Sequence, residues 1–153
     1  MNRSSYLKRK IDKTDHTILI ALFANGDITI KDLGNLVEMT SPSVSARILK
    51  MKDAGVIQNY TVAIDPIALE LTVEAYVRLS ALTGELNRLN RMLNETPQVV
   101  EANHVSGNDC FVAKVMVRDV KELDSLIERF SSVAATESNV ILSSTVPRRL
   151  PKL

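Results

Sequence analysis

Apolar residues in the first third of the chain recur at helical spacing. One face of the first predicted helix carries Ile11, Ile18, Leu19 and Leu22. Asp12 is a suitable N-cap with Asp15 three residues later, and Asn25-Gly26 is a pair that ends helices. A second short helix, beginning at Thr29 to Lys31, is predicted by Leu33, Leu36 and Val37. Gly34 lies inside it at a cost of ~1 kcal/mol relative to Ala, and we expect it to let a neighbouring helix approach closely.

A third helix follows after a very short gap. Thr40 or Ser41 caps it, Pro42 suits its first turn, and Gly55 ends it. Its buried face is predicted from three apolar residues at helical spacing, Val44, Ile48 and Met51. Three short helices, the last two tightly joined, predict a helix-turn-helix domain.

The periodicity changes after Gly55. Residues 56–64 place β-formers around the polar pair Gln58-Asn59, which predicts a small hairpin, the wing of a winged helix. Asp65-Pro66 then interrupts strand pairing. We therefore expect residues 1–64 to form a winged helix-turn-helix domain and residues 65–153 to form a second domain.

Strands and helices alternate in the second domain. Residues 71–82 alternate between apolar and polar side chains, as in a strand with one buried face. A helix with Leu86, Leu89 and Leu93 on one face follows and ends at Thr96-Pro97. Two more strands, residues 99–105 and 111–117, are joined by the turn-forming residues Ser106, Gly107, Asn108 and Asp109.

A second helix of this domain opens at Asp119, with Glu122 three residues later in a capping-box arrangement. Its inward residues are predicted to be Val120, Leu123, Ile127 and Phe130. The last strand is predicted from about residue 138 to 146. The order β-α-β-β-α-β is the ferredoxin-like arrangement, an α+β fold with both helices on one face of an antiparallel sheet. A partner subunit is the simplest cover for the other face, which carries Val112, Met116 and Ile141.

The composition is that of a globular protein. Of the 153 residues, 45% are apolar and 24% are charged, which argues against a disordered chain. The longest apolar run is residues 18–24, whereas a bilayer span needs about 20 residues, so we expect a cytoplasmic protein without a membrane segment. A single cysteine, Cys110, provides neither an internal disulfide nor a multi-thiolate metal site. No cofactor is expected.

The net charge of +1 is an average over unlike halves. Residues 1–60 hold 9 basic and 6 acidic side chains, a net +3, whereas residues 61–153 hold 10 and 12, a net −2. Much of the basic excess precedes Lys13, which suits an N-terminal arm that contacts phosphates. Since affinity for DNA rises with the number of phosphates neutralised, so weakly charged a chain needs several copies to bind DNA well.

The outer face of the third helix is the candidate DNA-binding surface, because it lies opposite the buried stripe and is free to enter a major groove. Small hydroxyl side chains near its N-terminus can approach base edges or phosphates, and the positive end of the helix favours phosphates. The candidate DNA-binding residues are Thr40, Ser41, Pro42, Ser43, Ser45, Ala46, Arg47 and Lys50. The alternative is an ordinary solvated helix face with its N-cap.

Several motifs in this order form a recognisable set. The N-terminal ones are Leu33-Gly34, Val37, Thr40-Ser41-Pro42-Ser43-Val44, Arg47-Ile48, Met51, Gly55-Val56-Ile57, Tyr60-Thr61 and Asp65-Pro66. The C-terminal one is Val105-Ser106-Gly107-Asn108-Asp109-Cys110-Phe111. Together they resemble the Lrp/AsnC family, the leucine-responsive or feast-and-famine transcriptional regulators. The resemblance runs from about residue 11 to residue 146.

The resemblance implies partners and a ligand. It implies binding to double-stranded DNA, a homodimer formed through the C-terminal sheet, and assembly of dimers into an octamer or a similar ring. A small-molecule effector, an amino acid, would bind between dimers. The implied effector-binding residues are Ser106, Gly107, Asn108, Asp109, Cys110, Thr136, Glu137 and Ser138. The amides of residues 108–110 suit a carboxylate, and Asp109 or Glu137 suits an ammonium group, although the alternative is an ordinary turn with solvated acids.

Two positions depart from the family pattern. Glu38 stands in the helix-turn-helix turn where the family often has Gly, so this turn must accept a residue with a Cβ or alter its geometry. Cys110 stands where the family commonly has Asp in the hairpin motif. This second departure bears on which effector binds, and on whether one binds at all.

Other functions find less support. His104 and Cys110 flank the hairpin in a suggestive thiol and imidazole arrangement, but a lone Cys is usually a small buried hydrophobe. No Gly-rich phosphate loop occurs, and we expect no enzyme. RNA-recognition domains share the β-α-β-β-α-β order, but the strand at residues 110–117 has one aromatic residue, Phe111, too few for base stacking.

We therefore predict a sequence-specific DNA-binding transcriptional regulator, oligomeric and modulated by an amino acid or related small molecule. The alternative is a ligand-insensitive architectural protein of the same fold that wraps DNA. A local regulator protects operators whose half-sites lie about 34 Å or a multiple apart, whereas an architectural protein protects long phased tracts.

Overall fold

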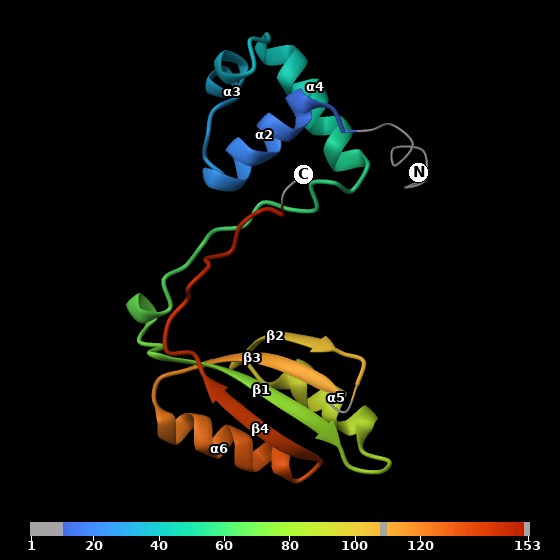
Figure 1. Ribbon diagram of the computed structural model, residues 1–153, viewed down its shortest axis with the longest axis vertical. Coiled ribbons are helices and arrows are strands. Elements are labelled where there is room, and N and C mark those ends of the chain that lie inside the picture. The colour runs from blue at the N-terminus through green and yellow to red at the C-terminus, as the bar shows by residue number, and fades with distance from the viewer. Residues whose placement is uncertain (1–10, 108–109, 152–153) are drawn as a thin grey trace. The chain divides into compact units, whose positions relative to one another are not determined.

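The computed structural model describes residues 11–107 and 110–151 (Figure 1). The chain divides into two units: one ends at Ala63 and also takes in the segment from Val146 onward, and the other comprises Ile64–Thr145. No helix in the described ranges is long and apolar enough to cross a membrane. The elements are α2 (Lys13–Ala24), α3 (Ile30–Leu36), α4 (Ser41–Asp53), η1 (Ile67–Leu69), β1 (Val73–Ala81), α5 (Leu86–Glu95), β2 (Val99–His104), β3 (Phe111–Val117), α6 (Val120–Ser131) and β4 (Ala134–Val140).

Helices α2 and α3 begin at side-chain caps. The Asp12 carboxylate accepts the Asp15 N–H at 2.8 Å and the Asp15 carboxylate accepts the Asp12 N–H at 3.4 Å, which together form a capping box. Thr29 caps α3 by accepting the Asp32 N–H at 3.1 Å. Each cap contributes about 1 kcal/mol to helix stability. The predicted starts of both helices, and the end of α2 at Asn25, are confirmed.

The turn between α3 and α4 explains Gly34. A Cβ on Gly34 would lie 2.7 Å from the Met39 carbonyl oxygen, and the Met39 N–H donates back to the Gly34 carbonyl at 2.9 Å. The close approach predicted at Gly34 is confirmed, but the approaching group is the backbone of the turn. The first residue of α4 is more distant, with the Ser41 nitrogen at 3.9 Å from the same Cβ position.

The core of the N-terminal unit joins all three helices. Its buried residues are Ile18, Leu33, Val44, Ile48 and Met51. The three inward residues predicted for α4 are therefore confirmed, each at most 5% exposed. Gly55 ends the helix in a left-handed conformation (φ 73°), and the Val56 N–H caps the Met51 carbonyl at 2.9 Å.

The hairpin predicted for residues 56–64 is wrong, because this stretch contains no strand. Val56 and Ile57 pack instead against the helical core. Tyr60, Val62 and Ile64 are 49%, 76% and 63% exposed. β-Forming residues make a strand only where a second strand pairs with them, and none pairs with this segment in the described chain.

The C-terminal unit is a four-stranded antiparallel sheet in the order β2-β3-β1-β4 with α5 and α6 on one face (Figure 1). The buried residues of β1 are Ala75, Val77 and Leu79. They pack in one core with Leu89 and Leu93 of α5 and with Leu123, Leu126 and Phe130 of α6. The predicted β-α-β-β-α-β order and the placement of both helices are confirmed.

Two details of this unit differ from the prediction. The last strand is Ala134–Val140 and not residues 138–146. It pairs with β1 from Ala81↔Ala134 to Ala75↔Val140. Because β1 begins at Val73, which this register places opposite Leu142, the residues after Leu142 lie beyond the end of β1. In α6 Val120 is 63% exposed at the first position of the helix, and Leu126 takes its place among the inward residues.

Candidate DNA-binding helix and effector hairpin

The outer face of α4 carries mostly small or polar side chains, together with Leu49, which is 59% exposed. Ser43 is half-buried, and the exposed predicted residues are Thr40, Ser41, Pro42, Ser45, Ala46 and Lys50. Its first turn has no acidic residue and its last turn carries Lys50 and Lys52, an arrangement that leaves the positive end of the helix uncompensated. The helix therefore offers small side chains and backbone amides at one end and a lysine further along.

The N-cap of α4 is open to a ligand. Thr40 has capping backbone angles, but its side chain makes no hydrogen bond to the helix amides. Its hydroxyl lies 2.9 Å from the Ser43 hydroxyl instead. Pro42 has no backbone N–H, so the first turn offers the N–H groups of Ser41 and Ser43, for which phosphate oxygens are suitable acceptors.

Arg47 differs from the other predicted DNA-binding residues. Its Nη1 lies 2.7 Å from Asp12 Oδ2 and 2.8 Å from Asp15 Oδ1, and its side chain is only 29% exposed. The Asp12 and then the Asp15 hydrogen bonds raise the pKa of Arg47, while the Asp15 backbone N–H and then the Arg47 guanidinium lower the pKa of Asp12. Sequence reasoning missed this cluster, because its members lie 32 and 35 residues apart.

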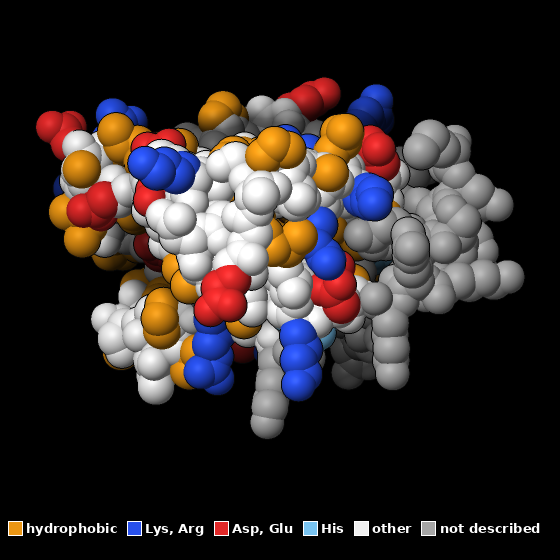
Figure 2. Space-filling view, turned by 90° about the horizontal axis from the view of Figure 1, so that it is seen from above, with side chains coloured by type: hydrophobic (Ala, Val, Ile, Leu, Met, Phe, Trp, Pro, Cys, Tyr) orange, Lys and Arg blue, Asp and Glu red, His pale blue; other side chains and the backbone are white. Residues whose placement is uncertain are grey.

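The charges on the N-terminal unit are dispersed. Lys52 Nζ lies 4.6 Å from the centroid of the Tyr60 ring, a cation–π contact that occupies the lysine. On the face shown in Figure 2, the coloured Lys and Arg side chains are interspersed with Asp and Glu and form no continuous basic patch among the described residues.

Glu38, which stands where the family often has Gly, adopts a backbone conformation that favours Gly. Glu38 has a φ of 54°, in the left-handed region that favours Gly. The turn therefore keeps the geometry that a Gly would adopt and accepts a Cβ there. The cost of this conformation is about 1 kcal/mol.

The structure separates the hairpin residues predicted to bind an effector. Ser106 and Gly107 are exposed, and Gly107 has a φ of 120°. Asn108 and Asp109 lie outside the described residues. The Cys110 N–H donates to the Leu79 carbonyl at 2.8 Å, so the prediction that this amide is available for a carboxylate is wrong: it continues the pairing of β3 with β1.

The predicted effector residues of β4 lie on two faces. Thr136 pairs with Leu79 and Ser138 pairs with Val77, so both are on the helix side of the sheet. The Thr136 hydroxyl lies 3.3 Å from the Ser131 hydroxyl. Glu137 is on the opposite face, with Oε2 3.5 Å from Arg78 Nη1.

The residues considered for catalysis have ordinary contacts. The His104 ring lies 5.0 Å from the Phe111 ring, and Cys110 Sγ accepts the Ala81 N–H at 3.4 Å. Within residues 11–107 and 110–151, no group of three His, Cys, Asp or Glu side chains is placed to hold a metal ion. Both side chains therefore contact neighbouring strands of the sheet, as structural residues do.

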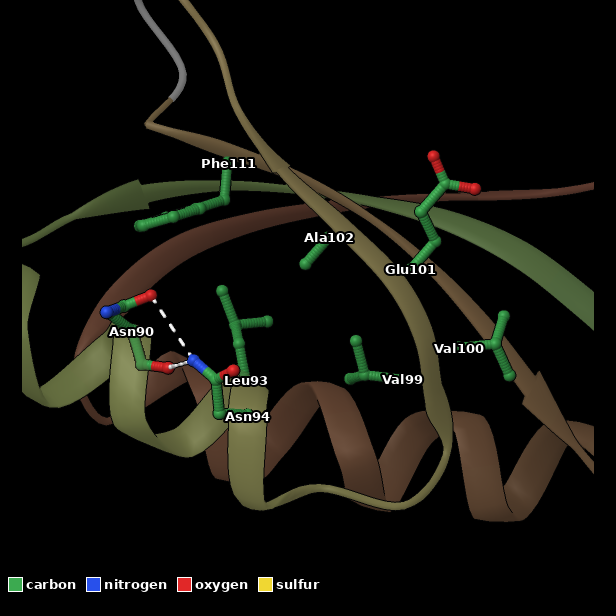
Figure 3. A pocket seen from close by; sticks show the side chains of 8 residues that line it. All are labelled: Asn90, Leu93, Asn94, Val99, Val100, Glu101, Ala102 and Phe111. Atoms are coloured by element: carbon green, nitrogen blue, oxygen red, sulfur yellow. Dashed lines mark hydrogen bonds between the residues drawn. The ribbon is translucent and has the colours of Figure 1, made fainter. Parts of the chain in front are cut away.

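An open pocket of about 290 Å³ lies between α5 and β2 (Figure 3). Its lining residues are Asn90, Leu93, Asn94, Val99, Val100, Glu101, Ala102 and Phe111. Asn94 Nδ2 donates to the Asn90 carbonyl at 2.7 Å along one wall. None of the predicted effector residues lines this pocket, and nothing in the sequence pattern singled it out.

The sheet face opposite the helices is partly apolar. Val112, Met116 and Ile141 are half-buried there, and Tyr76 is 47% exposed. A Lys114–Glu74 ion pair of 2.6 Å crosses from β3 to β1 on the same face. Within the described part of the C-terminal unit, both helices lie on the other face of the sheet.

Two family models match the chain. A model described as winged helix-turn-helix DNA-binding matches residues 11–58. A model described as Lrp/AsnC ligand binding domain matches residues 74–151, half of the chain. The chain belongs to the Lrp/AsnC family. The resemblance inferred from the motifs is thereby confirmed, as is the α+β fold class with its N-terminal DNA-binding domain of the winged-helix type.

Lrp/AsnC relatives match over nearly their whole length. The HTH-type transcriptional regulator Rv2324 of Mycobacterium tuberculosis is 31% identical over 147 residues, which cover 93% of this chain and 99% of that protein. Bacillus subtilis LrpC has the same fold, with a TM-score of 0.85 at 23% identity over 91% of this chain and 99% of that one. The Neisseria meningitidis transcriptional regulator NMB0573, in complex with L-Met, gives a TM-score of 0.86 at 21% identity, with 93% and 97% covered.

Proposed function

We propose that this Lrp/AsnC protein is a sequence-specific transcriptional regulator that acts in the cytoplasm as an oligomer. Residues 1–64 bind double-stranded DNA, and residues 65–153 bind an effector and hold the oligomer together. The observation that supports this most strongly is α4, which buries Val44, Ile48 and Met51 and exposes an opposite face of mostly small or polar side chains. That is the arrangement of a recognition helix.

The direct DNA contacts in this proposal are made by the outer face of α4. Ser41 and Ser45 approach base edges, and Lys50 adds positive charge. Thr40 and Ser43, together with the open amides of the first turn, hold a phosphate. Pro42 and Ala46 are small enough to allow close approach to the groove.

The oligomer in this proposal begins with a homodimer formed through the sheet. Val112, Met116 and Ile141 supply its apolar part, with Tyr76 beside them. Family resemblance suggests that dimers assemble further into an octamer or similar ring. A dimer places two recognition helices on one duplex, which compensates for the weak charge of a single chain.

The effector in this proposal is an amino acid bound between dimers near Ser106, Gly107 and Cys110, with Thr136 and Ser138 alongside. The L-Met complex of the Neisseria protein supports this ligand class. Glu137 is engaged by Arg78 on the other face, so Asp109 is the better candidate for the ammonium group.

A thermal-shift screen of the twenty amino acids tests whether an amino acid binds as an effector. We expect at least one to raise the melting temperature, since a ligand that prefers the folded state stabilises it; no shift at millimolar concentration contradicts effector binding.

Selection from random duplex DNA tests sequence-specific binding. We expect the protein to enrich a motif with two half-sites about 34 Å, or a multiple of that, apart, because a dimer presents two helices to successive turns of the groove. Nuclease footprints on the enriched duplex should be confined to these sites. Long phased protection without an enriched motif would contradict the proposal and would favour an architectural protein.

A further inference from the structure

The cluster of Arg47, Asp12 and Asp15 joins α4 to the start of α2. One guanidinium nitrogen, Nη1, is shared by two carboxylates at 2.7 and 2.8 Å. The two carboxylates are themselves held in place, because each also takes a backbone N–H in the capping box of α2. The Arg47 side chain is thus fixed by two carboxylates whose positions are already set by the capping box of α2.

The burial of Asp15 makes this contact demanding. Its side chain is only 10% exposed, and a carboxylate removed from water needs a charged or hydrogen-bonding partner. Arg47 immediately precedes Ile48, which is in the buried core with Ile18 of α2. The ion pair therefore lies at the edge of the packed surface, where it limits rotation of α4 about its own axis.

The charge of the cluster argues against a contact with phosphate. Two carboxylates and one guanidinium carry a net −1, and Asp12 is half exposed. A phosphate that approached Arg47 would meet this negative charge and would have to displace a bound carboxylate. Lys50, by contrast, is exposed on the outer face of α4.

We propose that Arg47 is a positioning residue that, through Asp12 and Asp15, holds α4 at the orientation in which its outer face reads DNA. This inference rests on the proposed DNA-binding function. Base contacts depend on the angle of the helix, whereas attraction to phosphates depends little on it. Loss of the cluster should therefore lower binding to a preferred sequence more than binding to unrelated DNA.

DNA-binding measurements on variants in which a charged side chain of the cluster is replaced by an uncharged amide test the proposal. The probes are a duplex enriched by the wild-type protein and a scrambled duplex of the same composition. Binding to each is measured by fluorescence anisotropy over a range of salt concentrations. The variants are Asp15→Asn, Asp12→Asn and Arg47→Gln, with Lys50→Ala for comparison. Asp15→Asn and Asp12→Asn each add one unit of positive charge to the chain.

We expect Asp15→Asn to bind the enriched duplex about tenfold more weakly and the scrambled duplex no more weakly than the wild type. Arg47→Gln should lose the same preference and leave the slope of log affinity against log salt unchanged, because no phosphate contact is lost. Lys50→Ala should reduce that slope by about 1 for each DNA-bound copy. Arg47→Lys should restore part of the preference, since one ammonium can replace one of the two bonds.

Tighter binding of the enriched duplex by both Asp→Asn variants is what plain electrostatics predicts, and it would overturn the proposal. A reduced salt slope for Arg47→Gln would do the same, because it would show a direct phosphate contact. If Asp15→Asn does not fold, by circular dichroism, the half-exposed Asp12→Asn decides the matter. Failure of the wild type to enrich any duplex would instead overturn the proposed function itself.

Discussion

Glu38 is a residue whose backbone conformation disagrees with its side chain. Its φ of 54° places it in the left-handed region, in the turn that sets the angle between α3 and α4. The substitution of Glu for Gly at this position was visible in the sequence, and so was the consequence that the turn must accept a Cβ. The Arg47 cluster was not predictable, because nothing local connects an arginine with carboxylates more than 30 residues earlier.

Replacing Glu38 with Gly should stabilise the N-terminal unit by up to about 1 kcal/mol. Gly removes the steric cost of the left-handed conformation, although it also makes the unfolded chain more flexible. Urea unfolding followed by helical circular dichroism measures the difference. Glu38→Ala is the matched control, since it removes the same charge but keeps a Cβ. Equal stabilisation by Ala and Gly would assign the effect to the charge and contradict the conformational account.

At the scale of elements, helices were predicted more successfully than strands. The buried stripe of α4 and the caps of α2 and α3 depend on residues close in sequence, so their pattern is sufficient. The wing hairpin and the last strand depend on a partner. Residues 141–146 are as rich in β-formers as β4, yet they form no strand, and those after Leu142 lie past the end of β1.

The start of α6 provides a test in acid. The Arg118 backbone N–H, the Gln98 amide and the Arg118 guanidinium, in that order, lower the pKa of Glu122 from its ordinary 4.5 to about 2. Because the pKa is lower in the folded state, the ionised carboxylate contributes its full stabilisation above about pH 4.5 and loses it as the pH falls toward 2.

We therefore expect Glu122→Gln to flatten the loss of stability between pH 4.5 and 2. Melting temperatures of the wild type and the variant across that range provide the measurement. Glu128→Gln, an exposed substitution on the same helix, should leave the wild-type curve unchanged. Parallel curves for the wild type and Glu122→Gln would show that this network does not stabilise the fold.

At the scale of the whole molecule, the order of elements and the division of charge were predictable from the sequence. The alternation of strands and helices predicted the sheet with both helices on one face. The two family models match a DNA-binding part and a ligand-binding part on either side of the predicted domain boundary. The pocket between α5 and β2 was not predictable. The pocket depends on how α5 packs beside β2, which a periodic pattern along the chain does not describe. The opposite faces of Thr136 and Glu137 follow from strand alternation once β4 begins at Ala134, but the sequence pattern placed the start of that strand at residue 138.

The central claim is that the outer face of α4 reads DNA. Lys50→Ala, compared with Lys121→Ala on α6, tests it most directly, because both variants remove one exposed lysine and only one of them lies on α4. On a duplex enriched by the wild type, Lys50→Ala should weaken binding by about 1–3 kcal/mol while Lys121→Ala binds as the wild type does. Undiminished binding by Lys50→Ala, or an equal loss in both variants, would contradict the account.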